Sequence, residues 1–176
     1  KDKDHVLWFE GTTENHFQGP TLSQLEDSAL EWEDVDSVDD LLALASSTDA
    51  DILSKNYRLT KDLDLEGVEF SGIGSGTAPF TGIFDGQGHT VSNVSIKREA
   101  ENTGFFNVIK GATIKNLNLE NAEITGTTNV GGLVGWAQVQ LDQENIAKNI
   151  ANLIGSCTVT GTVNGETKVG GLVGVN

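Results

Sequence analysis

The chain has 176 residues, with 26 acidic and 11 basic side chains and a formal net charge of −15. A surface this acidic repels phosphate backbones and anionic headgroups, which argues against nucleic-acid binding and membrane insertion. The 21 glycines and only 2 prolines exclude a proline-rich linker or a collagen. The lone Cys157 excludes an internal disulfide, and no apolar run is long enough for a transmembrane helix.

Residues 1–35 form an acidic segment in which no regular element stands out. Residues 6–9 (VLWF) could be a short strand, and residues 20–32 carry a weak helical pattern. Six acids cluster at Glu31, Glu33, Asp34, Asp36, Asp39 and Asp40. They could bind calcium or a basic partner, but they lack the spacing of a calcium loop, so a solvated surface is the favoured interpretation.

A short amphipathic helix is predicted over residues 37–46. Ser37 followed by Asp40 is a start similar to a capping box, and acids in the first turn suit the helix dipole. Apolar residues then recur at helical spacing from Val38 to Ala45, and residues 49–51 (DAD) are expected to end the helix. We expect residues 36–56 to form a cap and linker that cover the first strand of a β domain.

Short alternating runs separated by glycine and asparagine begin at Tyr57, and they predict β-strands. Each run is too short to bury its apolar face alone, so the strands must stack on one another. The expected strands are residues 57–59, 63–65, 83–84, 90–96, 104–106, 112–119 and 122–124.

Two motifs repeat inside residues 57–176. The hexapeptide VGGLVG at residues 130–135 recurs at residues 169–174, and a degenerate copy lies at residues 103–106. The hexapeptide VSNVSI at residues 91–96 is matched by residues 114–119 and 154–159. Repeats of this length made of short strands are typical of a solenoid whose turns stack in parallel. The sequence therefore predicts an all-β parallel β-helix with a short α-helical cap at its N-terminal end.

The second motif also predicts which side chains stack. The inward columns expected from it are Val91/Ile114/Ile154, Val94/Leu117/Cys157 and Ile96/Leu119/Val159. Asn93 and Asn116 should stack with Ser156 at a bend, where amide side chains can bond to one another. The residues predicted to define the repeats are Asn93, Asn116, Gly131, Gly132, Leu133, Gly135, Gly170, Gly171, Leu172 and Gly174.

Unequal repeat spacing places insertions in loops on one side, the longest at residues 136–149 with a partly helical pattern. The last residues follow a repeat motif directly, without a closing signal, and neither methionine nor a signal-peptide pattern occurs. We therefore expect the natural protein to continue into further repeats or domains.

With these motifs, the sequence resembles the GLUG-repeat family, which is named for its Gly-Leu-any-Gly core. The core appears here as residues 132–135 and 171–174, and the stretches 57–65 and 80–91 are similar to the beginning of the family's repeats. The resemblance covers residues 36–176. It implies a right-handed parallel β-helix from a secreted or cell-surface bacterial protein, such as an adhesin or the N-terminal region of an IgA-cleaving metalloprotease. It implies no shared catalytic residues.

Asp62 and Asp64 are the candidate chemical residues of the repeats. They lie two apart on one strand, so both carboxylates should face outward while Leu63 and Leu65 face the core. Such a pair could hold calcium or act on a polysaccharide, although a solvated strand face with Arg58 nearby is the favoured alternative.

The other candidates have stronger structural explanations. Asp85 and His89 could be an acid–base pair, but Asp85-Gly86 predicts a turn. The glycine loop at residues 72–76 lacks the spacing of a nucleotide-binding loop and is interpreted as a turn. His5 and His16 have no third metal ligand at a recognisable spacing, and Cys157 occupies an inward position.

We expect a non-catalytic structural or adhesive module of an extracellular surface protein, without a cofactor unless calcium binds. It would act as a stalk or as a surface that contacts a host protein or glycan. Two alternatives stay open. The chain could be an accessory region of a secreted metalloprotease, or a polysaccharide-acting enzyme that uses Asp62 and Asp64.

Overall fold

The computed structural model describes residues 30–139 and 150–176. These residues form mostly β-strands, and every strand pair among them is parallel. The all-β prediction with parallel pairing is confirmed. The predicted strand at residues 6–9, His5, His16 and most of the loop at residues 136–149 lie outside the described residues.

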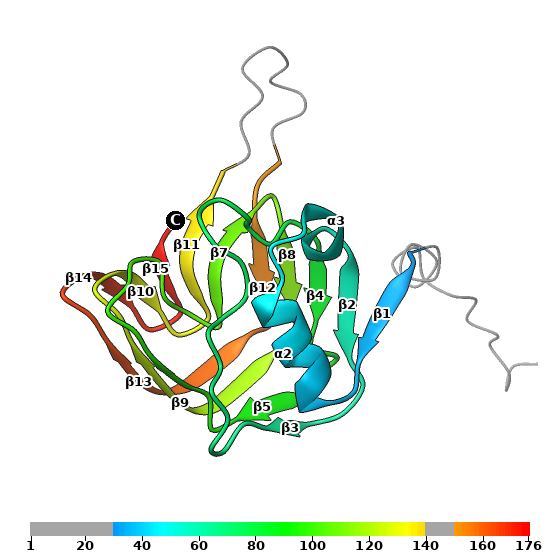
Figure 1. Cartoon of the computed structure of the whole chain (residues 1–176), viewed down its shortest axis with the longest axis horizontal. Helices are drawn as coiled ribbons and strands as arrows, with labels where there is room; N and C mark the ends of the chain where they lie inside the picture. Colours follow the sequence, from blue (N-terminus) through cyan, green and yellow to red (C-terminus); the bar gives the residue numbers. More distant parts are fainter. Residues whose placement is uncertain (1–29, 140–149) are drawn as a thin grey trace, which may run out of the picture. The chain divides into compact units, whose positions relative to one another are not determined.

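The strands lie in four successive levels, which we call tiers (Figure 1). The first tier contains β2 (Asn56–Leu59) and β3 (Leu63–Asp64). The second contains β4 (Ile83–Asp85), β5 (Thr90–Ser92), β6 (Ser95–Lys97) and β7 (Phe106–Lys110). The third contains β8 (Thr113–Lys115), β9 (Asn118–Thr125), β10 (Thr128–Gly131) and β11 (Val134–Gln138). The fourth contains β12 (Leu153–Gly155), β13 (Thr158–Asn164), β14 (Thr167–Gly170) and β15 (Val173–Val175).

Each strand pairs with the equivalent strand of the next tier, which produces four sheets. Their orders are β1-β2-β4-β8-β12, β3-β5-β9-β13, β10-β14 and β7-β11-β15, and β6 also pairs with β9. Strand β1 (Trp32–Val35) lies outside the four tiers and pairs with β2 of the first. The number of residues that separates equivalent positions of successive tiers is not constant. Phe106 pairs with Val134, and Val134 pairs with Val173, so the second step along the chain is longer than the first. The extra residues lie between β11 and β12.

The predicted stacking is partly wrong in register. The columns Ile114/Ile154 and Leu119/Val159 are confirmed. Val91, however, pairs with Leu119 rather than Ile114. The predicted repeat was misleading because Asn93 and Asn116 occupy different corners of the tier. Each corner joins two short strands through a residue of the same left-handed conformation, so the two sequences look alike.

Left-handed residues mark the bends of each tier, both between strands and within longer ones, and asparagine is the side chain that best tolerates a positive φ. Asn93 has φ of 57° and Asn121 of 53°, and Asn121 Nδ2 lies 3.4 Å from Asn93 Oδ1 in the tier above it. A second column contains Asn102, Asn129 and Lys168, with φ of 56°, 55° and 53°. The expectation of amide ladders at bends is therefore correct, but Asn93 and Asn116 belong to different ladders.

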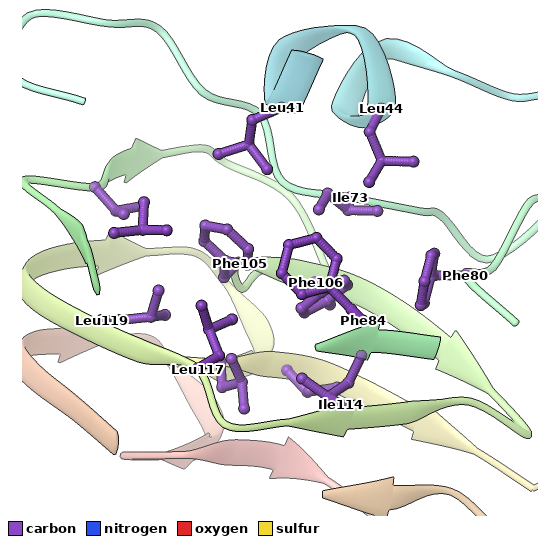
Figure 2. Close-up of a cluster of buried hydrophobic side chains, with 14 of the residues drawn as sticks. Leu41, Leu44, Ile73, Phe80, Phe84, Phe105, Phe106, Ile114, Leu117 and Leu119 are labelled. Carbon is purple, nitrogen blue, oxygen red and sulfur yellow. The ribbon is translucent and has the colours of Figure 1, made fainter. Parts of the chain in front are cut away.

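The interior of the tiers holds a continuous apolar core. Aromatic rings from the first two tiers pack in it, including Phe84 against Phe106 with centroids 5.4 Å apart in an edge-on arrangement. Leu117, Leu119 and Ile114 continue the core in the third tier and are fully buried (Figure 2).

Helix α2 (Val38–Ser46) covers the N-terminal end of this core. Its N-cap Ser37 accepts a hydrogen bond from the backbone N–H of Asp40, as the capping-box pattern predicts. Leu41 and Leu44 are buried, and Figure 2 shows them projecting from α2 toward Ile73 and the phenylalanine cluster.

Two expectations for this region need correction. A strand, β1 (Trp32–Val35), precedes the helix and pairs with β2, so the sheet begins within residues 1–35, where the sequence predicts no clear strand at this position. The sequence of β1 does not show the alternating pattern of a strand, because only Val35 is buried. Its two acids, Glu33 and Asp34, form ion pairs with Lys55 before β2 and with Arg58 in β2. Residues 49–51 do not end the helical region either, since Asp49 is the N-cap of a second helix, α3 (Ala50–Leu53).

Candidate functional site

Asp62, directly before β3, and Asp64, its last residue, lie on the outer surface as predicted, while Leu63 and Leu65 are buried. Asp62 Oδ1 accepts a hydrogen bond from the backbone N–H of Thr90 at 2.9 Å and lies 3.1 Å from His89 Nδ1. Asp64 Oδ1 accepts from Asn93 Nδ2 at 2.8 Å and from the N–H of Glu66 at 3.0 Å. Both carboxylates therefore bind donors of the next tier, and the expected neighbour Arg58 pairs with Asp34 instead.

These hydrogen bonds favour the ionised carboxylates. The backbone N–H of Thr90, and then His89, lower the pKa of Asp62 below its ordinary value. The Asn93 amide, and then the N–H of Glu66, lower the pKa of Asp64. A general acid needs a raised pKa, so the surroundings of this pair suit hydrogen-bond acceptors between tiers better than a proton donor.

Asp85 and His89 do not form the acid–base pair considered from the sequence. The turn interpretation is confirmed, because the N–H of His89 bonds to the carbonyl of Gly86 and Gln87 has a φ of 53°. Asp85 is only 2% exposed. It accepts hydrogen bonds from Gln87 and from Asn116 Nδ2, and it lies 3.3 Å from Lys115 Nζ.

Asp85 belongs to a row of alternating charges that the sequence did not reveal. Strand pairing aligns Asp34 with Arg58, Arg58 with Asp85, and Asp85 with Lys115, across four neighbouring strands. Arg58 Nε binds Asp34 Oδ1 at 2.6 Å. Opposite charges at facing positions stabilise the pairing and disfavour a slipped register. The row could only have been found from the correct register.

The glycines of the repeated hexapeptide lie where successive tiers approach each other. A methyl group at Gly131 would lie 2.6 Å from the backbone nitrogen of Gly174 in the next tier, and one at Gly174 would lie 2.7 Å from the carbonyl oxygen of Gly135. Gly132 faces the carbonyl oxygen of Gly171 in the next tier. The repeat glycines therefore permit close stacking, which explains the recurrence of the motif.

The remaining candidates have structural roles in the described residues. Cys157 is half-buried and packs against the core, and burial raises the pKa of its thiol. In the loop at residues 72–76, Gly72 and Gly74 have positive φ, and Ile73 between them pairs with Phe106. Within residues 30–139 and 150–176, no three His, Cys, Asp or Glu side chains are arranged to hold a metal. No helix of this part of the chain could span a membrane.

A surface hollow of about 750 Å³, the lateral recess, lies between residues 67–71 and the side chains of Ser95, Lys97 and Arg98. Its outer wall is anchored by Arg98 Nη1 and Asn107 Nδ2, which both donate to the carbonyl of Ser71. Phe70 anchors the same wall by packing on Phe105, with centroids 5.0 Å apart. Among the described strands β6 pairs only with β9, so the other edge of β6 is not used by a neighbouring strand.

Comparison with known proteins identifies a partial relative. No family model matches the chain, and no solved structure matches it. Halomucin of Haloquadratum walsbyi is similar, with 35% identity over 153 residues. The match covers 80% of this chain and 2% of Halomucin, so the chain spans a small fraction of the length of the curated relative it matches.

Proposed function

We propose that this chain is a non-catalytic structural and adhesive module of an extracellular surface protein, folded as a right-handed parallel β-helix of the GLUG-repeat type. The observation that carries the proposal is the stacking of four tiers of parallel strands in register. A right-handed path is the expected one, because crossovers between parallel strands have this hand almost without exception.

The use of polar side chains between tiers supports a structural role. Asp62, Asp64 and Asp85 bind donors in the next tier. Carboxylates held in this way stabilise the stack of tiers. The relative named Halomucin supports an extracellular location, as does the resemblance to GLUG repeats.

The lateral recess is the surface that we assign to recognition. Its lining combines the apolar Val68 and Phe70 with hydroxyls and charged groups. The exposed side chains of Ser95, Lys97 and Glu69 suit the many hydroxyls of a glycan. The anchored wall keeps the recess open in the absence of a ligand, so little ordering is required on binding. A host glycan is therefore the partner that we favour over a host protein.

A glycan array probed with the fluorescently labelled chain tests this assignment. We expect binding to a defined set of glycans, a loss of at least about tenfold in affinity in Lys97→Ala and Ser95→Ala, and no change in Lys61→Ala, a control at an exposed lysine outside the recess. An equal loss in all three variants would remove the recess from the proposal. A chain that binds no glycan would be left with the spacer role alone.

One observation favours the alternative of a polysaccharide-acting enzyme, which is the contact of Asp62 with His89. That alternative requires turnover of a polysaccharide and its loss in Asp62→Asn with the fold intact. We expect no turnover by the unmodified chain, measured as release of reducing ends and of unsaturated products. Turnover that disappears in Asp62→Asn would replace our proposal with the enzymatic one.

A further inference from the structure

The burial of equivalent residues changes abruptly between the third and fourth tiers. Val130 and Leu133 are fully buried, whereas their counterparts Val169 and Leu172 are 44% and 37% exposed. Val159 and Val163 are also only partly covered, although Leu119 and Ile124 above them are fully buried. The core thus reaches the C-terminal end of the stack without a cover in the described residues.

The strand edges at this end are open as well. Each of the four sheets terminates on a strand of the fourth tier, namely β12, β13, β14 or β15. A hollow of about 450 Å³, lined by valine, leucine and glycine, lies against β13, β14 and the residues that follow β14. The N-terminal end differs, because α2 places Leu41 and Leu44 over the core there (Figure 2). Open edges that lie over exposed apolar side chains are surfaces that proteins normally cover.

The glycine pattern gives a second, independent indication. A methyl group at Gly132 would collide with the carbonyl oxygen of Gly171 in the next tier, so that position must be glycine. Gly171 is the equivalent residue one tier later, and a methyl group there would meet no atom within 4 Å. Nothing in the described structure requires a glycine at this position. The open space next to Gly171 corresponds to the space next to Gly132 that the backbone of the following tier fills.

We propose that the C-terminal end of the stack is an interface for one further tier of the same fold. Its strands would add in parallel to β12, β13, β14 and β15, and its inward valine, isoleucine or leucine side chains would fill the hollow. The proposal continues the interface that already joins the third and fourth tiers, and it rests on the β-helix of the proposed function.

The test lengthens the chain by a second copy of residues 138–176, which spans one repeat, placed after Asn176. Hydrogen exchange of the backbone amides of β12–β15 is then compared in the two chains. We expect exchange in these strands to slow by at least about tenfold in the longer chain, because their edges become paired and buried. Unchanged exchange in these strands would overturn the proposal.

The substitution Gly171→Val supplies the matched control. It should leave the melting temperature of the original chain within about 2 °C, since the space is open, and lower that of the extended chain, where the added backbone would be in contact. Equal effects in both chains would contradict the interface. Gly132→Val should destabilise both chains, which verifies that the assay detects the collision.

Two further results separate the competing explanations. If the original chain forms a dimer in light scattering that Leu172→Lys abolishes, a second copy and not a further tier occupies this end. If amides of β5 and β9 exchange freely in both chains, the β-helix itself, and with it the proposed function, is wrong. Slow exchange in β5 and β9 with unchanged exchange in β12–β15 would reject the interface alone.

Discussion

Asn129 donates a hydrogen bond from Nδ2 to Oδ1 of Asn102 at 2.6 Å, while its own Oδ1 is buried and has no partner in the described residues. The next position of this corner column is Lys168, whose side chain has no amide and whose φ is 53°. The ladder of amides therefore stops one tier early and leaves one acceptor unsatisfied.

Lys168→Asn should complete this ladder. An asparagine tolerates the left-handed conformation better than lysine, and its amide can donate to Asn129 Oδ1. We expect an increase of about 1 kcal/mol in the free energy of unfolding, measured by urea denaturation. Lys168→Ala is the control, since it removes the lysine without supplying an amide. A gain of the same size in both variants would contradict the explanation by a hydrogen bond.

Gly131→Ala should lower the free energy of unfolding by about 1–3 kcal/mol, because the added methyl group would overlap the carbonyl oxygen of Val134 in its own tier and lie 2.6 Å from the backbone nitrogen of Gly174 in the next tier. Gly155→Ala is a suitable comparison, since no atom lies within 4 Å of its added methyl group. Thermal melting of both variants provides the measurement. If both are equally unstable, the close approach of the backbone at Gly131 is not the reason for the repeat glycine.

The buried Asp85 should contribute more to stability than the exposed Asp34 of the same charge row. Asp85→Ala removes the buried carboxylate that Lys115 and Asn116 share, and we expect a loss of about 3 kcal/mol. Asp34→Ala breaks an exposed, solvent-screened ion pair with Arg58 and should cost clearly less than Asp85→Ala. Urea denaturation of the two variants at neutral pH checks the order, and a reversed order would contradict it.

Acid should destabilise the protein partly through Asp64. The pKa of Asp64 is lower in the folded chain than its ordinary value of 3.8. Its contribution is therefore complete above this ordinary value and is lost as the pH falls through the folded-state pKa. We expect the melting temperature of Asp64→Asn to fall less steeply below about pH 4 than that of the unmodified chain. Parallel curves would show that Asp64 is not responsible.

Salt should raise the melting temperature, because a net charge of −15 produces repulsion that counter-ions screen. Calorimetric scans between about 0.05 and about 1 M NaCl would measure the increase. Replacing Asp39, Glu66 and Glu69 by their amides changes the net charge by three, from −15 to −12, and should reduce the salt effect. A melting temperature that falls with salt would show that ion pairs outweigh the repulsion.

The strands, the helix over residues 37–46 and the parallel stacking could be predicted from the sequence because each leaves a local pattern. Ser37 and Asp40 identify the helix start, and the VGGLVG repeat identifies equivalent strands. The register of Val91 could not be predicted, since two corners built on Asn93 and Asn116 have the same local sequence.

The contacts of the candidate residues could not be predicted from the sequence for a related reason. His89 approaches Asp62 from the next tier, and Lys115 likewise approaches Asp85 from the tier that follows it. Such contacts depend on which strands face each other, and a single error in register changes all of them. Acidic β1 was missed because its outward acids bind Lys55 and Arg58, a fact that only the pairing with β2 reveals.

The unequal number of residues per tier has a practical consequence for protein engineering. Val134 pairs with Phe106 and with Val173 in the same parallel manner, although the second step covers a longer stretch of chain than the first. The additional residues between β11 and β12 leave the paired strands on either side in register. A foreign peptide epitope grafted at this junction should thus be displayed by the scaffold without disturbing the layers that carry it.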